Sequence, residues 1–274
     1  MAAPGVMRDI SAGPGQDAPT AELRRPHRDE PYAPATNDKP LLLAHGGTLT
    51  VDRLGTVPYE PTWELQDELA QQRRERRIGD RLLLLEHFPV YTIGRGGDAS
   101  NLIATPQRLR ELGATFIRVD RGGDITFHGP GQLVAYPIVE LRDPFDLRRY
   151  VRTLEAAIIA TAAQFGVEAE RVDGLTGVWV DGQRKLAAIG VRVRRGVTTH
   201  GLALNVKTDL RWFAEMVPCG IRDKDVTSLE RELAHPVEME AAEEALAVQL
   251  ASHLGLRITS GLPGVVGPGG ASEQ

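Results

Sequence analysis

The chain has 274 residues, of which 42% are hydrophobic and 25% are charged, and its formal net charge is −5. This composition predicts a globular protein with a core of ordinary size, and it lacks the strongly basic balance of a nucleic-acid-binding domain. The one cysteine, Cys219, cannot form an internal disulfide bond, and the longest apolar runs, such as residues 82–85, are too short to cross a bilayer.

The two ends of the sequence are predicted to be disordered. Residues 1–39 and 261–274 are rich in proline, glycine and alanine and show no apolar period, so burial cannot offset the entropy of ordering them. No charged-then-apolar leader begins the chain, and we therefore expect a cytoplasmic protein with no membrane association. Residues 40–260 contain no linker and no repeat, which predicts a single catalytic domain.

Four helices are predicted within this domain, from apolar spacing and from the residues at their ends. They are expected at residues 61–77, 106–113, 145–165 and 236–254. Pro61 and Pro106 suit a first helical turn, whereas Gly113 and Gly255 suit the position just after a helix.

Strand-like runs fill the intervals between these helices. They are expected at residues 82–86, 90–94, 115–119, 133–139, 177–180, 186–193 and 197–206. The pairs Asp181–Gly182 and Arg195–Gly196 are typical of hairpin turns, so much of the sheet should be antiparallel. The pattern predicts an α+β (mixed α/β) fold with a central mixed, largely antiparallel β-sheet flanked by helices, and not a doubly wound nucleotide-binding fold.

Residues 121–133, RGGDITFHGPGQL, form the densest unusual segment of the chain. Its glycines and proline bracket a short strand at residues 124–127, so the backbone turns sharply twice and lets a ligand come close. Two tight turns with a charged edge are the structural alternative. No phosphate-binding glycine motif is present, and no second cysteine or HxxxH spacing accompanies His128, so we predict neither a metal site nor a cofactor.

Two adjacent strands carry small residues where bulk is usual. Residues 188–190 and 201–203 include glycine and alanine, and facing one another they would leave a groove for an elongated apolar ligand, although small residues also permit close packing. Lys185 begins the first of these strands, where its ammonium could be partly desolvated. A surface lysine at the end of a strand is the ordinary alternative.

Cys219 lies between Pro218 and Gly220, in the sequence PCGI. A proline with a fixed φ and a permissive glycine would hold the thiol on a turn, which favours a presented nucleophile. Free cysteine is also among the most buried residue types, so local sequence leaves an inert buried thiol open.

Six ordered blocks of the chain together resemble the lipoyl(octanoyl) transferase family. The RGGxxxxHGPGQL and PCGI blocks are the most specific, and the resemblance covers roughly residues 50–255. The blocks are Arg53–Gly55 with Tyr59, residues 86–95 (EHFPVYTIGR), 121–136, 185–190, 200–205 and 218–221.

The resemblance implies a catalytic domain like that of the biotin and lipoate protein ligases. It implies transfer of octanoyl from octanoyl-acyl carrier protein to lipoyl domains of 2-oxoacid dehydrogenase complexes and to the glycine cleavage H protein, with no cofactor. Cys219 corresponds to the nucleophile that forms an acyl thioester, and Lys185 to the lysine that lowers the pKa of that thiol. The substrate-binding residues it implies are Arg121, Gly122, Gly123, Asp124, Ile125, Thr126, Phe127, His128, Ala188, Ile189, Gly190, Gly201, Leu202 and Ala203.

Two other classes of function stay open at this point. An ATP-dependent lipoate or biotin protein ligase would share the fold, but it forms an acyl-adenylate and needs no cysteine nucleophile. A catalytically inactive, carrier-binding relative is the third possibility, and the presence of both Cys219 and Lys185 argues against it.

Overall fold

The computed structural model describes residue 43 and residues 47–217 and 224–260, all of which belong to the compact unit Lys39–Gln274. The predicted disordered ends, 1–39 and 261–274, lie outside the described residues, and so does Cys219. The boundaries of the predicted domain therefore stay a prediction.

Nine strands of the described chain form the main sheet, in the order β12-β1-β2-β6-β10-β9-β8-β7, with β11 beside β9. β1 pairs in parallel with β12 and β2, and β11 pairs in parallel with β9, whereas the other neighbours are antiparallel. The predicted mixed, largely antiparallel sheet is confirmed. The strands are β1 (Thr48–Val57), β2 (Asp80–His87), β6 (Gln132–Ile138), β7 (Glu170–Val172), β8 (Leu175–Val180), β9 (Arg184–Arg194), β10 (Val197–Asn205), β11 (Asp225–Val226) and β12 (Arg257–Ser260).

A second sheet of three strands has the order β4-β3-β5. Its strands are β3 (Val90–Ile93), β4 (Thr115–Arg118) and β5 (Ile125–His128). The sequence predicts these strands at nearly the right residues, but not that they leave the central sheet. The short η1 (Ala99–Asn101) and α2 (Pro106–Leu112) connect β3 to β4.

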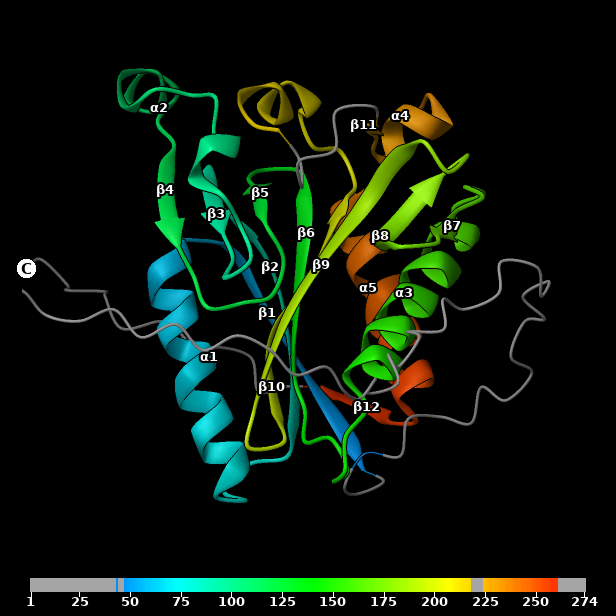
Figure 1. The fold of residues 1–274 in the computed structure, drawn as a ribbon. Coiled ribbons are helices and arrows are strands. Elements are labelled where there is room, and N and C mark those ends of the chain that lie inside the picture. The colour runs from blue at the N-terminus through cyan, green and yellow to red at the C-terminus, as the bar shows by residue number, and fades with distance from the viewer. Residues whose placement is uncertain (1–42, 44–46, 218–223, 261–274) are drawn as a thin grey trace, which may run out of the picture. The chain divides into compact units, whose positions relative to one another are not determined.

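Helices cover both faces of the main sheet, as predicted (Figure 1). α1 (Tyr59–Arg74) packs on β6 and β10, while α3 (Leu147–Gln164) and α5 (Met239–Leu254) pack together on the opposite face. The larger apolar core lies between the sheet and α3 and α5, and a smaller core lies under α1. η2 (Leu210–Glu215) and α4 (Leu229–Leu233) follow β10 and β11.

Local chemistry sets the ends of the predicted helices and hairpins. Thr105 Oγ1 accepts a hydrogen bond from the backbone N–H of Arg108 at 3.1 Å, which caps α2, and Gly113 ends that helix with a φ of 64°. The residues of the turn between β9 and β10, Arg195 and Gly196, have φ values of 51° and 80°. Positive φ at both central residues is what a tight hairpin turn requires, so this hairpin prediction is confirmed.

Candidate active site

A cavity of about 500 Å³ lies among β5, β9 and β10, the loop before β8, and η2. Its volume is in the usual range for small-molecule sites, and its wall is mostly apolar, with a few polar groups. The sequence-predicted residues that line it are Arg121, Gly123, Asp124, Ile125, Thr126, His128, Lys185, Ala188, Ile189, Gly190, Gly201, Leu202 and Ala203. Substrate binding by these residues stays a prediction.

The pairing of β9 with β10 places the two small-residue segments directly opposite each other. Gly190 is paired with Gly201, Ile189 with Leu202, and Ala188 with Ala203. Gly190 also leaves room for the side chain of Arg121, since a Cβ there would lie 2.9 Å from Arg121 Cδ. The small residues therefore serve two purposes, because they line the cavity and they let neighbouring groups approach the strand.

Arg121 fixes the glycine-rich turn against β3. Its guanidinium is buried and donates from Nη2 to both the carbonyl oxygen and the hydroxyl oxygen of Thr92, each at 2.8 Å. Its Nη1 donates to the carbonyl oxygen of Gly122 at 3.0 Å. The conformation of the turn is thus held by a charged group that lies at the cavity wall.

A chain of buried polar side chains connects His128 to the strand beside Lys185. The Nε2 of Gln132 donates to Asn205 Oδ1 at 3.0 Å, so its Oε1 is the acceptor for His128 Nδ1 at 2.8 Å. Asn205 Nδ2 in turn donates to the carbonyl oxygen of Thr227 at 2.9 Å. Burial, and then repulsion by a protonated His87 and by the charge of Arg121, lower the pKa of His128 well below its usual value. His128 is therefore a neutral imidazole whose Nε2 is a hydrogen-bond acceptor at the cavity wall.

Lys185 lies at the start of β9 and lines the cavity. Its Nζ is 4.7 Å from the centre of the indole ring of Trp179, on the neighbouring strand β8. On the other side of β9, the backbone N–H of Thr227 donates to the carbonyl oxygen of Lys185 at 2.9 Å. The lysine is thus held between two strands, with its side chain at the cavity.

Cys219 itself lies outside the described residues, but the chain on both sides of it is placed. Met216 and Val226 line the cavity together with Lys185. The N–H of Val217 donates to the carbonyl oxygen of Asn101 at 2.7 Å, and Lys224 Nζ donates to the carbonyl oxygen of Gly182 at 2.7 Å. The six residues from 218 to 223 therefore connect two anchored points near the same cavity.

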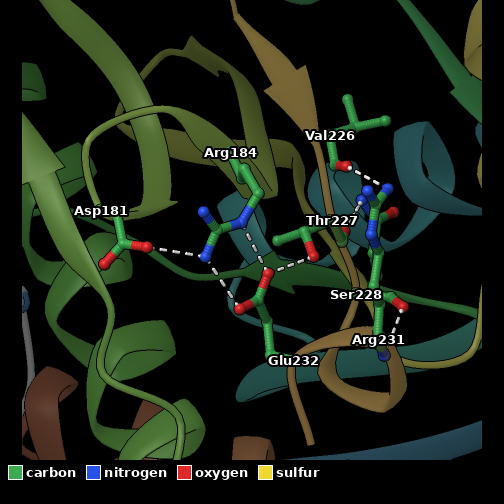
Figure 2. A network of polar contacts seen from close by, with 8 residues as sticks. Asp181, Arg184, Val226, Thr227, Ser228, Arg231 and Glu232 are labelled. Carbon is green, nitrogen blue, oxygen red and sulfur yellow. Dashed lines mark hydrogen bonds and ion pairs between the residues drawn. The ribbon is translucent and has the colours of Figure 1, made fainter. Parts of the chain in front are cut away.

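A polar network holds the chain around Thr227, which follows the segment 218–223, against β9 (Figure 2). Arg184 makes two hydrogen bonds to the carboxylate of Glu232, at 2.9 and 3.0 Å, and Thr227 Oγ1 donates to the same carboxylate at 2.5 Å. Asp181 accepts a further hydrogen bond from Arg184 at 2.8 Å. The hydrogen bond from Arg184 lowers the pKa of Glu232, so its carboxylate is ionised at neutral pH.

Two residues predicted to bind substrate do not line the cavity. Phe127 is fully buried and stacks on Trp212, with ring centroids 4.9 Å apart. The N–H of Gly122 donates to the carbonyl oxygen of Val191 at 3.0 Å, so this glycine joins the turn to β9. Both residues contact neighbouring elements and are not part of the cavity lining.

Several lining residues were not predicted from the sequence. Gln132 and Asn205 belong to blocks already singled out, where a polar residue at the end of a strand was the available signal. The unpredicted lining residues are Gly96, Gln132, Gly174, Leu175, Thr176, Asn205, Phe213, Met216 and Val226.

Two further histidines lie buried near His128. His87 donates from Nδ1 to the carbonyl oxygen of Val57 at 3.0 Å and accepts at Nε2 from the hydroxyl of Tyr136 at 2.8 Å. Burial lowers its pKa to about 4. His200 Nε2 is 2.9 Å from Asp120 Oδ1, and burial lowers its pKa although the carboxylate opposes the shift. No local sequence pattern predicts this cluster, because its members come from separate strands.

Within the residues described, no group of three or more histidine, cysteine, aspartate or glutamate side chains is arranged to hold a metal ion. The same part of the chain contains no helix that is long and apolar enough to cross a membrane.

Comparison with known structures shows that this fold is that of lipoate protein ligases. The bipartite lipoate protein ligase of Thermoplasma acidophilum superposes with a TM-score of 0.62 at 18% identity, over 80% of this chain and 88% of that one. Lipoate-protein ligase A bound with ATP also gives 0.62, at 16% identity, over 79% and 89%. At these identities the likeness is one of fold.

Sequence similarity identifies the family. Residues 58–251 match the lipoyl protein ligase A/B catalytic domain, and the chain belongs to this family. It is 53% identical over 201 residues to the octanoyltransferase of Rubrobacter xylanophilus, covering 72% of this chain and 90% of that protein. It is 48% identical over 218 residues to the octanoyltransferase of Chloroflexus aggregans, covering 78% and 99%. The resemblance to lipoyl(octanoyl) transferases is confirmed.

Proposed function

We propose that this chain is an acyltransferase that moves an octanoyl group from octanoyl-acyl carrier protein to a specific lysine of lipoyl domains, through a thioester on Cys219. Its relatives named octanoyltransferase support octanoyl transfer in protein lipoylation. The observation that supports the mechanism most directly is the cavity. Its mostly apolar wall suits an acyl chain, and Lys185 lines it together with Met216 and Val226, which lie on either side of the segment that contains Cys219.

In the first step, the thiolate of Cys219 attacks the carbonyl carbon of the donor thioester. A new C–S bond forms, the C–S bond of the donor breaks, and the donor leaves as a thiolate that takes a proton from the ammonium of Lys185. A free thiol, with a pKa of about 8.5, is only a few per cent thiolate at neutral pH, so a nearby ammonium raises the reactive fraction. One thioester replaces another, and the step needs no ATP.

In the second step, the amine of the acceptor lysine attacks the thioester on Cys219. An amide C–N bond forms, the C–S bond to Cys219 breaks, and the neutral amine of Lys185 takes the proton that the attacking nitrogen loses. The acceptors we propose are lipoyl domains of 2-oxoacid dehydrogenase complexes and the glycine cleavage H protein. Two half-reactions that share one acyl-enzyme predict ping-pong kinetics.

The decisive experiment is transfer from octanoyl-acyl carrier protein to an apo lipoyl domain without ATP. We expect octanoylation by the wild type and an octanoyl adduct on Cys219 by mass spectrometry in the absence of acceptor. Cys219→Ala should lower the rate by roughly 10³-fold or more, and Lys185→Ala by roughly 10²- to 10⁴-fold. Lys207→Ala is the matched control, since Lys207 is exposed and outside the cavity lining, and it should retain the wild-type rate.

The alternative is an ATP-dependent lipoate or biotin protein ligase. It predicts transfer from free acid only when ATP is present, and full activity of Cys219→Ala. Either result, or a wild type that forms no acyl adduct on Cys219 with the donor, would overturn the proposed mechanism.

A further inference from the structure

The side chain of Lys185 lies against β8, on the face of the strand that Gly177 and Trp179 share. Residues two apart on a strand point to the same face, and Trp179 is the register partner of Lys185 across the β8–β9 pair. A Cβ at Gly177 would lie 3.5 Å from Lys185 Cε and 2.6 Å from the carbonyl oxygen of Ala187. The absence of a side chain at Gly177 is thus required by the close approach of the Ala187 carbonyl oxygen, and the lysine stem passes beside it at ordinary contact distance. The ammonium lies 4.7 Å from the centre of the indole ring.

A buried carboxylate holds the backbone of β8 at Gly177. Gly177 has a φ of 118°, and the β8–β9 register shifts between Val178 and Trp179. Glu155, fully buried on α3, accepts a hydrogen bond from the N–H of Gly177 at 3.1 Å and forms ion pairs with Arg152 at 2.6 Å and Arg171 at 3.2 Å. The irregular strand is thus fixed from the opposite face of the sheet.

Trp179 is one of the largest fully buried side chains of the described chain. It is 1% exposed, it is absent from the cavity lining, and its Nε1 has no hydrogen-bond partner among the described residues. An indole face attracts an ammonium more strongly than the other aromatic rings do, and the attraction grows when the pair is shielded from water.

We propose that Trp179 is a positioning residue, whose indole face holds the ammonium of Lys185 at the cavity for the proton transfers of acyl transfer. The inference rests on the role proposed for Lys185. The other described titratable groups of the cavity wall are Arg121, Asp124 and His128, and Lys224 and Asp225 lie beside the start of β9. Arg184 is engaged by Glu232 and Asp181.

The test is a double-mutant cycle with Trp179→Leu, Trp179→Phe and Lys185→Ala. Iodoacetamide alkylation of Cys219, the one thiol of the chain, is measured across pH, together with kcat and KM for transfer. Trp179→Leu should slow alkylation at neutral pH and lower kcat by about tenfold, with KM unchanged, because an aromatic–ammonium contact is lost while the cavity wall is intact. Trp179→Phe keeps a ring face, so its alkylation rate and its kcat should lie between those of the wild type and those of Trp179→Leu. On the Lys185→Ala background, the Trp179→Leu change should have no further effect.

A second readout does not depend on activity. In the wild type, the ε-methylene NMR signals of Lys185 should be shifted upfield by the indole ring current, and this shift should vanish in Trp179→Leu. Equal effects of Trp179→Leu with and without Lys185, equal rates for the leucine and phenylalanine variants, or an unshifted wild-type signal would each overturn the inference. Loss of transfer in the wild type, with the upfield shift and its loss in Trp179→Leu intact, would instead refute the proposed function alone.

Discussion

At the scale of single residues, Gly201 shows how tightly the floor of the cavity is packed. Its φ is not in the left-handed region, so the cost of a side chain there is steric. A Cβ would contact the carbonyl oxygen of Ala135 at less than van der Waals separation and would lie 2.8 Å from Pro137 Cδ, both on the neighbouring strand β6. Backbone atoms within a sheet cannot move aside without breaking their ladder hydrogen bonds.

We therefore expect Gly201→Ala to destabilise the fold by about 1–3 kcal/mol, the usual cost of overpacking. Gly79→Ala is the matched control, because no atom lies within 4 Å of the Cβ position there and its φ is also not left-handed. Urea unfolding midpoints of the two variants give the comparison. Equal midpoints for Gly201→Ala and the wild type would show that β6 yields to the methyl group.

The candidate site was predictable where its residues stand together in sequence. The 121–133 segment and the small residues of β9 and β10 carried a local signal. Of the substrate-binding residues predicted there, at 121–128, 188–190 and 201–203, the structure brings all but Gly122 and Phe127 to one cavity. Trp179 carried no such signal, since TGVWV is an ordinary strand sequence and its contact with Lys185 depends on strand register. The placement of Cys219 relative to Lys185 stays a prediction.

At the scale of elements, the network around Glu232 ties α4 and β11 to the start of β9. Arg184, Thr227 and Glu232 come from three elements or their ends, and their hydrogen bonds converge on one carboxylate (Figure 2). The N–H of Thr227 then bonds to the carbonyl oxygen of Lys185. The network thus fixes the backbone on one side of Lys185, as Glu155 does on the other.

Glu232→Gln should weaken this attachment, because the amide can offer Arg184 only one acceptor oxygen and no charge. We expect Tm to fall by a few degrees and the amide hydrogen of Thr227 to exchange faster with solvent. Glu244→Gln is the matched control, as it removes an exposed ion pair with Arg53 at 2.6 Å and should change neither quantity. Unchanged exchange at Thr227 in Glu232→Gln would show that strand pairing alone holds β11.

Helices whose ends carry characteristic residues were predicted closely. Strands that depend on pairing with residues far away in the sequence were not. α1 begins at Tyr59 and ends at Arg74, two and three residues from the prediction, while Arg76 adopts a φ of 57° just beyond it. β1 was not predicted, and it is interrupted by a register shift between Arg53 and Thr56 and by Gly55 at a φ of 65°. β12 was not predicted either, and among the described residues its four residues pair only with β1. The division into two sheets depends on which strands pair with one another, and the apolar periodicity of the sequence does not encode this pairing.

At the scale of the whole molecule, three buried neutral histidines lie in the layer between α1 and the strands. The rings of His87 and His128 are 5.8 Å apart, and His200 contacts Trp63 of α1 at 6.1 Å. Burial lowers the pKa of all three. Their neutral forms are part of the native hydrogen-bond network, so protonation must oppose folding.

The sign of the pH dependence follows from the direction of these shifts. A histidine whose pKa is lower in the folded chain than in the unfolded chain contributes its full stability above about pH 6.5, and this contribution is lost as the pH falls toward the folded value. For His87, with a folded pKa of about 4, the loss at pH 5 is about 2 kcal/mol, or roughly 4–8 °C in Tm. We expect Tm to fall between pH 7 and pH 5, and to fall less steeply in His87→Gln, which cannot titrate. His235→Gln, at an exposed position, should keep the wild-type slope. A wild-type Tm that is constant over this range, or a His87→Gln slope equal to that of the wild type, would show that these histidines are not the groups that set the acid limit of the fold.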